Sequence, residues 1–515
     1  MAIACPALSA ERVYFADPNL LAVVEEKLGI EQPTAADMLD LTEFEAAKRR
    51  VVDLSGLGYA RNLKKLNLYS NRIRDISALA ELTDLNDLDL SYNDITDISG
   101  LSGLVNIRRL NLRSNPISDV RAVSGLANLT DLTLSGRNIR DISVLSRLTN
   151  LRELSVCDSQ VRDYGAVLGL TNLTYLSLSG NRISEIPSLA GLTNLRMLGL
   201  GYNEISDVSS LGKLSNLTSL GIRSNPISDI SALCGLTNLT NLYLENTPVS
   251  DISGLAGLTN LECLWLQGNQ ISDISALRGL TNLKLLLLNR NQISNISALS
   301  GLTNLTGLSS YRNQISDLGA LSDLPNLRSV CISHNQIRDV SALSELTNLR
   351  CLRVGDNQIS DISGLADLTE VHNLWLFEND ISDISALSGL TKLSELRLGD
   401  NHISDISALA GLTSLRTLEL RGNPLNRAAY YIYLPLIRQK NPDLRKLAYD
   451  PNPNPLTNDG LIDLMDFTEF ALSQVGADCD EYNEWCDGAD LNQSGKVNLD
   501  DVAEFADCLF EVTGQ

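Results

Sequence analysis

The sequence contains few histidines, few tryptophans and few basic residues, and it has no long apolar run. Its 515 residues include 3 histidines and 3 tryptophans, and 41 lysines and arginines stand against 63 aspartates and glutamates, which gives a net charge of -22. Nucleic-acid binding is driven by clustered lysine and arginine, so this charge argues against a nucleic-acid partner. A membrane-spanning helix needs about 20 consecutive apolar residues. Because no run approaches that length, the sequence predicts no membrane span.

The few histidines are poorly placed for catalysis. His334, His372 and His402 occupy unrelated positions of the repeat described below. An active site needs a nucleophile and a base held by an orienting acid. Cys331 is close to His334 in the sequence, but no third group is evident. We therefore predict that the protein is not an enzyme and has no catalytic residues.

Nine cysteines are an odd number and do not have the spacing of a small disulfide framework. Cys331 and Cys351 are expected on adjacent strands but two residues out of register, a diagonal separation of roughly 7 to 8 Å, which is too long for an unstrained disulfide. We interpret the cysteines within the repeats as mostly free thiols. Cys479, Cys486 and Cys508 could supply one disulfide and one free thiol, with three possible pairings.

The sequence is instead dominated by one unit of 22 residues that repeats without an insertion. One position of this unit recurs seventeen times, from residue 71 to residue 423, and is asparagine fourteen times; the exceptions are Arg137, Ser159 and Thr247. A period of this length predicts a solenoid. Fourteen aspartates also share one equivalent position, from Asp75 to Asp405, so much of the acidity follows from copying the unit.

The apolar residues around Asn71 predict the form of the unit. The two-residue step from Leu66 to Leu68 indicates a short strand. The later apolar residues follow in steps of three, which fits a backbone with about three residues per turn, as in a 3-10 helix. Neither segment buries its leucines without neighbours, so the strands must stack in parallel. The Asn71 amide can bind buried backbone groups where the chain leaves the strand.

The pattern LxxLxLxxNxIxDIxxLxxL resembles the leucine-rich repeat family, and the 22-residue unit with SDISAL is similar to the bacterial internalin subtype. The resemblance covers about residues 11–450 and implies a solenoid of the α/β horseshoe class, with a parallel sheet on the concave face and 3-10 segments on the convex face. The predicted domains are a tail or export-signal remnant (1–10), a helical N-terminal cap (11–58), the repeats (59–424), and a C-terminal cap and linker (425–455).

The strand residues that flank the buried leucines are expected to point onto the concave face. Tyr243, Trp265 and Leu287 should form an apolar ladder there, and Trp375 and Phe377 a second cluster. Such residues could simply fill the curvature, but contiguous apolar patches usually mark interaction sites, and aromatic residues are enriched in binding hot spots. Internalin-like proteins bind a partner protein through concave aromatic residues. The predicted partner-binding residues are Tyr243, Trp265, Leu285, Leu287, Tyr311, Trp375 and Phe377.

Charged residues lie next to the second cluster. Arg353, Arg397 and Arg421 alternate with Glu395 and Glu419 along the expected concave face. They could form a polar rim around a binding site or a solvated ladder of charges. Exposed ion pairs contribute little to stability, and the sequence slightly favours the solvated ladder.

A different duplication follows the repeats, with DFTEFA at 466–471 and DVAEFA at 501–506. The second copy contains DLNQSGKVNLDD, which matches a calcium loop of the EF-hand type. It resembles the type I dockerin family, which attaches extracellular bacterial proteins to cohesin domains, and this implies Ca²⁺ and a cohesin-like partner for a small helical module over residues 456–515. The predicted ligands are Asp490, Asn492, Ser494, Lys496 through its carbonyl, and Asp501, with a weaker site at Asp459, Asp463 and Asp466.

These features together predict a binding protein. We expect a monomeric bacterial protein, extracellular or attached to the cell surface, that recognises a protein partner on its concave face and is tethered by the calcium-dependent module. No export signal is visible in this chain. One alternative is a purely structural surface component, and a less favoured one is a hydrolase that carries a dockerin.

Overall fold

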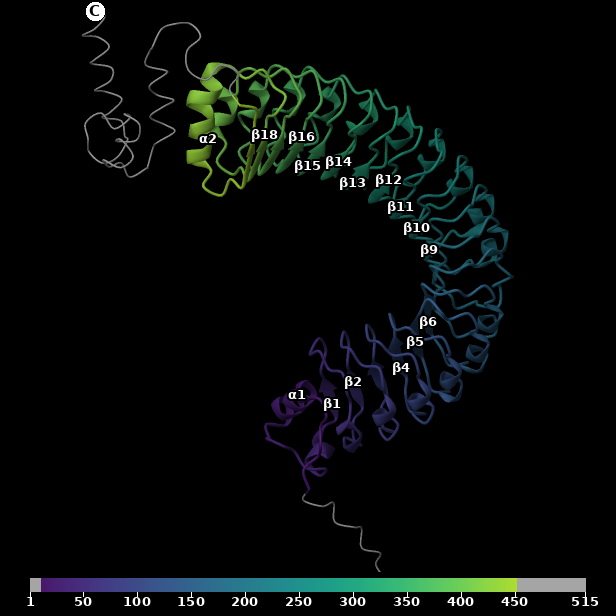
Figure 1. Cartoon of the computed structure of the whole chain (residues 1–515). Coiled ribbons are helices and arrows are strands. Elements are labelled where there is room, and N and C mark those ends of the chain that lie inside the picture. Colours follow the sequence, from purple (N-terminus) through teal and green to yellow (C-terminus); the bar gives the residue numbers. More distant parts are fainter. Residues whose placement is uncertain (1–10, 452–515) are drawn as a thin grey trace, which may run out of the picture. The chain divides into compact units, whose positions relative to one another are not determined.

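The structure is a computed structural model that describes residues 11–451. The chain divides into two compact parts, residues 1–287 (the first part) and residues 288–515 (the second part). Both parts repeat one unit, in which a short strand is followed by a turn and, in most repeats, by a 3-10 helix. Within each part the strands lie along the inner face and the 3-10 helices along the outer face (Figure 1).

The first part begins with helix α1 (Pro18–Leu28), which precedes the strands. Its 3-10 helices run from Asp37–Asp40 to Ser275–Leu277. Its described strands are β1 (Glu43–Glu45), β2 (Lys65–Asn67), β3 (Asp87–Asp89), β4 (Arg109–Leu112), β5 (Asp131–Ser135), β6 (Glu153–Cys157), β7 (Tyr175–Ser177), β8 (Met197–Gly199), β9 (Ser219–Gly221), β10 (Asn241–Tyr243), β11 (Cys263–Trp265) and β12 (Leu285–Leu287).

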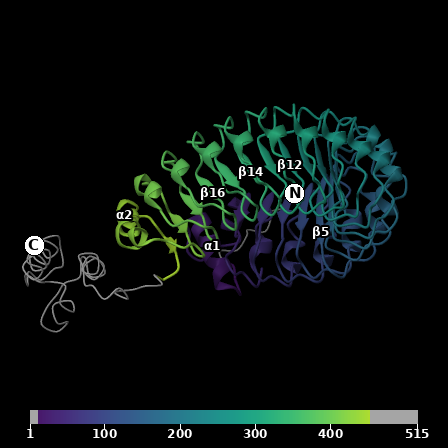
Figure 2. The same cartoon turned by 90° about the horizontal axis from the view of Figure 1, so that it is seen from above.

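The second part continues the pattern, with a short helical segment between its strands β18 and β19. A π-helical turn (Ala429–Tyr433) leads into helix α2 (Leu434–Lys440), which lies beside the last repeats (Figure 2). The described strands of this part are β13 (Gly307–Ser309), β14 (Ser329–Cys331), β15 (Cys351–Arg353), β16 (Asn373–Trp375), β17 (Glu395–Arg397), β18 (Thr417–Glu419) and β19 (Lys446–Ala448).

Neighbouring strands pair in parallel with a shift of one repeat, so equivalent residues lie side by side. Tyr243 is opposite Trp265 in the first part, and Arg353 is opposite Trp375 in the second. The leucines that alternate with these residues point inward, and both Leu264 and Leu266 are fully buried. The parallel strands and the 3-10 helices predicted from the spacing are therefore confirmed.

The recurring asparagine hydrogen-bonds to backbone groups of two successive repeats. Asn93 Nδ2 donates at 3.0 Å to the carbonyl oxygen of Leu90 in its own repeat and at 3.0 Å to that of Leu68 in the repeat before. Its Oδ1 accepts a hydrogen bond of 3.0 Å from the backbone N–H of Ile73. The amide thus satisfies groups that the strand ladder leaves unpaired.

A second asparagine ladder was not predicted. The asparagine of the repeated TNL segment is exposed, and it donates to a backbone carbonyl of the preceding repeat. Asn282 reaches Thr259 O at 2.9 Å in the first part, and Asn348 reaches Pro325 O at 3.0 Å in the second.

The recurring aspartates begin the 3-10 helices. Asp75 Oδ1 accepts a hydrogen bond of 2.8 Å from the backbone N–H of Ser77, the first residue of such a helix. This bond, with a further one from the Ser77 hydroxyl, lowers the pKa of Asp75. Asn295 occupies the equivalent position in one repeat and accepts the same bond from Ser297 at 2.9 Å.

One repeat lacks this 3-10 helix. Glu185 and Pro187 stand where most repeats have aspartate and serine. Proline has no N–H to donate, so the bond that begins the helix cannot form. No helix is present between β7 and β8, and Ile186 is only half-buried although the equivalent Ile76 is buried.

The predicted calcium module, residues 456–515, lies outside the described residues. The capping roles predicted for the two ends and the predicted domain limits stay predictions.

Candidate binding surfaces on the strand face

Tyr243 and Trp265 pack against each other on the inner face of the first part. Their ring centroids are 4.9 Å apart with an interplanar angle of 83°, an edge-to-face contact. Leu285 and Leu287 on β12 follow in register, and all four side chains are half-buried. Strand alternation therefore brings these residues together, as predicted. Trp265 is less exposed than the sequence suggested, because its ring lies against Tyr243.

A hollow of about 350 Å³ adjoins Tyr243 and Trp265. We call it the glycine-floored groove, because glycines stand on its floor where other repeats carry side chains. Its lining includes Gly199, Gly201, Gly221, Tyr175, Met197 and Arg223 together with the two aromatic residues. Sequence reasoning missed this groove, although two of its glycines directly precede Tyr243 in the central column of the inner face.

A charged pair lies at the edge of this groove. Arg223 Nη1 is 3.3 Å from Glu245 Oε1, and the Glu245 side chain is only 5% exposed. Its other oxygen, Oε2, is buried without a hydrogen-bond partner among residues 11–451. On the neighbouring strand, burial raises the pKa of the Cys263 thiol, while the adjacent Trp265 indole acts in the opposite direction.

The second part carries a stack of two arginines and one tryptophan on its inner face. The guanidinium carbon of Arg353 lies 3.9 Å from the centre of the Trp375 ring, and that of Arg397 lies 4.1 Å from it. The three residues follow one another in register on β15, β16 and β17, so Trp375 lies between the two cations. We call these residues the Arg–Trp–Arg stack.

Phe377 extends the apolar surface of the stack. Its ring centroid is 6.3 Å from that of Trp375. The ring lies over Gly355, where a Cβ atom would approach it to 2.5 Å, so the glycine makes room for the phenylalanine. The structure therefore brings the predicted residues Trp375 and Phe377 together. Tyr311, on another repeat of this part, instead has Arg290 above its ring at 5.9 Å.

The charged residues near this cluster form ion pairs with each other and with Lys446. Arg397 Nη2 is 2.6 Å from Glu395 Oε1, and Lys446 Nζ is 2.8 Å from Glu419 Oε2. Arg421 is exposed. Arg353 is not one member of a uniform solvated ladder, because it is half-buried against Trp375.

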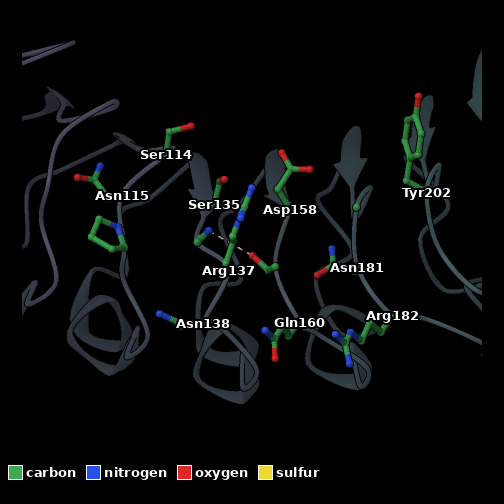
Figure 3. Close-up of a pocket in the computed structure, with 14 residues that line it drawn as sticks. Ser114, Asn115, Ser135, Arg137, Asn138, Asp158, Gln160, Asn181, Arg182 and Tyr202 are labelled. Carbon is green, nitrogen blue, oxygen red and sulfur yellow. Dashed lines mark hydrogen bonds between the residues drawn. The ribbon is translucent and has the colours of Figure 1, made fainter.

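A second hollow, of about 940 Å³, lies where the asparagine ladder of the first part is interrupted. Arg137 and Ser159 replace the asparagine there, and the adjacent strands β5 and β6 are five residues long, whereas most strands have three. The Gly136 N–H donates a hydrogen bond of 3.4 Å to Ser159 Oγ, which partly replaces the bonds of the missing asparagine. The hollow is lined largely by polar residues, among them Arg137, Asp158, Gln160, Arg182 and Tyr202 (Figure 3).

The histidines lie in separate repeats. His334 contacts Asp356, His402 Nε2 is 3.6 Å from Asp380 Oδ1, and His372 Nδ1 is 2.8 Å from a backbone carbonyl oxygen. No group of three or more potential ligands that could hold a metal ion occurs within residues 11–451. The predicted calcium ligands, Asp490 among them, lie outside this range. The absence of catalytic residues stays a prediction.

Two further sequence predictions concern thiols and membrane spans. The five described cysteines are free, as predicted: Cys157, Cys234, Cys263, Cys331 and Cys351. In the described part of the chain, no helix is long and apolar enough to cross a membrane.

The repeated strand, turn and 3-10 helix define a solenoid of stacked leucine-rich units. The family model for leucine rich repeats (2 copies) matches residues 149–279 and 303–429, more than half of the chain, and a second leucine rich repeat model matches residues 61–117. The chain therefore belongs to the leucine-rich repeat family. These matches end at residue 429, so they do not bear on the dockerin resemblance of residues 456–515.

The chain is similar to several solved structures, two of which, with TM-scores above 0.5, share its fold. A leucine-rich repeat protein of Leptospira interrogans is 24% identical over 80% of this chain and 97% of its own, with a TM-score of 0.56. The ectodomain of the Arabidopsis receptor kinase HAESA, in complex with a peptide hormone ligand, is 24% identical over 72% and 68%, with a TM-score of 0.57. An internalin of Listeria monocytogenes is 28% identical over 79% and 97%, with a TM-score of 0.39. The comparison with curated proteins gave no match.

Proposed function

We propose that this protein binds a protein ligand on the strand face of its repeats, with Tyr243, Trp265 and the glycine-floored groove as the principal contact in the first part. The observation that carries the proposal is the pairing of a packed aromatic wall with an adjoining hollow of about 350 Å³. Binding hot spots are typically aromatic anchors in well-packed surroundings.

The packing of Trp265 favours binding. Its ring rests edge-on against Tyr243, so its conformation is set before a ligand arrives. A side chain that is already ordered loses little further entropy on association. The half-buried ring still offers apolar surface that a ligand can remove from water.

The alternative, a purely structural component, is less consistent with the glycines. If large side chains on this face only filled the curvature, the neighbouring repeats should also carry large residues. Gly199 and Gly221 instead leave the space beside Tyr243 open. A residue from a partner can enter this space, whereas a purely structural role gives no reason for it.

Truncation of Trp265 tests the proposal. Trp265→Ala should weaken capture of the ligand by at least about 2 kcal/mol, which is roughly 30-fold. In the measurement, the immobilised full chain captures proteins from an extract of the protein's natural environment. The amount of each captured protein is then compared between wild type and variant. Tyr59→Ala is the matched control, because Tyr59 is 51% exposed and belongs to a 3-10 helix rather than to the inner face.

Unfolding midpoints separate binding from packing in this test. Trp265→Ala should lower stability less than Leu264→Ala, because Leu264 is fully buried and a buried leucine replaced by alanine typically costs 2 to 5 kcal/mol. Capture equal to wild type, or a stability loss as large as that of Leu264→Ala, would contradict the assignment of Trp265 to binding.

We also propose that residues 456–515 bind calcium and tether the protein, at the cell surface or outside the cell, through a cohesin-like partner. The support is the sequence match of the loop that begins at Asp490. Replacing Asp490 and Asp501 together with alanine should abolish the calcium-binding heat of this segment in titration calorimetry, because both supply carboxylate ligands in the loop pattern. The circular dichroism of the repeats should be unchanged. Unaltered calcium binding by the double variant would refute the loop assignment.

A further inference from the structure

We infer that the Arg–Trp–Arg stack of the second part is a recognition site for the carboxylate of an acidic side chain of the ligand. This inference rests on the proposed function, because it assigns a ligand chemistry to the second aromatic cluster of the strand face.

Arg353 is a half-buried cation that has no counterion in the described part of the chain. Along its own strand the residues on the same face are Cys351 and Gly355, and its neighbours in register are Cys331 and Trp375, none of which is acidic. Within residues 11–451, Arg353 has no ion-pair partner, and its Nε is buried without a hydrogen-bond partner. Burying part of a cation without an anion costs free energy. A bound carboxylate would offset this cost by pairing with Arg353.

The nearby carboxylates are already engaged. Glu395 accepts from Arg397 through Nε at 2.8 Å and Nη2 at 2.6 Å, and Glu419 is paired with Lys446. The pair with Glu395 neutralises Arg397, so Arg353 is the charge of the stack that has no counterion among residues 11–451.

The unsatisfied groups of the stack are all donors. Besides Arg353 Nε, the indole Nε1 of Trp375 is buried without a hydrogen-bond partner in the described structure. Unpaired donors favour the binding of an anion or another hydrogen-bond acceptor, whereas Arg353 would repel a cationic ligand. At the groove of the first part the buried groups without a partner include the Trp265 indole Nε1 but also the Glu245 carboxylate oxygen Oε2, so that surface, unlike the stack, also presents an unpaired acceptor.

The stack is preorganised for a planar, bidentate contact between an arginine and a carboxylate. A guanidinium stacked on an aromatic face loses part of its torsional freedom and keeps its edge for hydrogen bonding. An arginine–carboxylate pair of this kind forms two parallel bonds. Phe377 and Trp375 place apolar surface beside the cation, so the favoured ligand carries its carboxylate next to an apolar side chain.

The acidity of the whole chain does not prevent this recognition. Its net charge of -22 repels an acidic ligand at long range, but at physiological ionic strength charges are screened beyond about 8 Å. The contact is therefore local, and it should weaken when salt is raised.

The experiment titrates the full chain against fluorescently labelled oligo-L-glutamate and follows fluorescence anisotropy. Oligo-L-glutamine of the same length is the uncharged probe, and both probes are amidated at the C-terminus so that they differ only in their side-chain carboxylates. Wild type should bind the glutamate probe at least tenfold more tightly than the glutamine probe. Arg353→Gln should remove most of this difference. Arg353→Lys should restore it only in part, because lysine keeps the charge but not the planar pair of donors.

Arg338→Gln is the matched control. It removes the same charge in the second part from an exposed arginine whose Nε bonds to Gln358 at 3.0 Å, away from the stack. Its affinity for oligo-glutamate should equal that of wild type, and the unfolding midpoints of all variants verify folding. Equal binding of the two probes by folded wild type, or equal loss in Arg353→Gln and Arg338→Gln, would overturn the inference.

A second variant distinguishes a separate ligand from the chain's own acidic segment. The full chain with Asp478, Asp480, Glu481 and Glu484 replaced by the corresponding amides should bind oligo-glutamate as wild type does. Binding that emerges only in this variant would overturn the inference in favour of an internal occupant. Because the probe replaces the natural ligand, failure here leaves the Trp265 capture test standing.

Discussion

Replacing Asn401 with alanine should lower the free energy of unfolding by about 2 to 4 kcal/mol, because several buried backbone groups lose their partner at once. Asn401 is 3% exposed. Its Nδ2 donates to the carbonyl oxygens of Leu376 at 2.9 Å and Leu398 at 3.0 Å, and its Oδ1 accepts from the Ile381 N–H at 3.1 Å. Alanine cannot form any of these bonds. Because the amide is buried between two repeats, water cannot readily replace it.

The control is Asn348→Ala in the same part of the chain. Asn348 is exposed and makes one recurring contact, to the Pro325 carbonyl oxygen at 3.0 Å, where water can take its place. Its replacement should cost less than about 1 kcal/mol. Denaturant unfolding of the full chain measures both variants. Similar midpoint shifts for the two would show that burial of the amide is not what makes the ladder stabilising.

The positions where the asparagine ladder is interrupted show which structural features the sequence predicts and which it does not. The 22-residue spacing was sufficient to predict the strands, their parallel pairing and the asparagine at each strand exit, because every repeat must satisfy the same backbone groups. The spacing also identified Arg137 and Ser159 as departures. It did not predict their consequence, the five-residue strands β5 and β6 and the polar hollow beside them. The shape of such a site depends on how the backbone relaxes across several repeats.

Of the candidate surfaces, the sequence predicted the aromatic clusters but not the groove or the stacking, for a similar reason. Strand alternation is a local rule, so it placed Trp265 beside Tyr243 and Trp375 near Phe377. The glycine-floored groove exists because glycines such as Gly199 have no side chain, and a single glycine in a repeat does not by itself indicate a groove. The stacking of Arg353 on Trp375 depends on side-chain torsions, which a periodic sequence does not fix.

Acid should destabilise the repeats because of the aspartates that begin the 3-10 helices. Hydrogen bonds from the backbone N–H and the hydroxyl of the following serine lower the pKa of most of these carboxyl groups, among them Asp207, Asp229 and Asp251. At Asp119, hydrogen bonds from Arg121 lower the pKa to about 2. Each bond is weak by itself, but the same bond recurs along the solenoid, and each repeat depends on its neighbours.

The direction of this effect follows from linkage between protonation and folding. A carboxyl group whose pKa is lower in the folded state stabilises that state fully above its unfolded value, about 3.9, and this contribution disappears as the pH falls through the folded value. The thermal midpoint should therefore decline steadily between about pH 5 and pH 2, as measured by circular dichroism at constant ionic strength.

Asn295 supplies the control for this prediction, because it accepts the same backbone bond without an ionisable group. A full chain with Asp207, Asp229 and Asp251 changed to asparagine should match or exceed wild-type stability at pH 7, since the substitution also removes the mutual repulsion that Asp229 exerts on its neighbours. At pH 3 the variant should retain more of its neutral-pH midpoint than wild type does. If both proteins lost stability equally on acidification, the acid sensitivity would have to come from carboxylates elsewhere in the chain. Asp207, Asp229 and Asp251 would then act only as hydrogen-bond acceptors, which asparagine can replace at any pH.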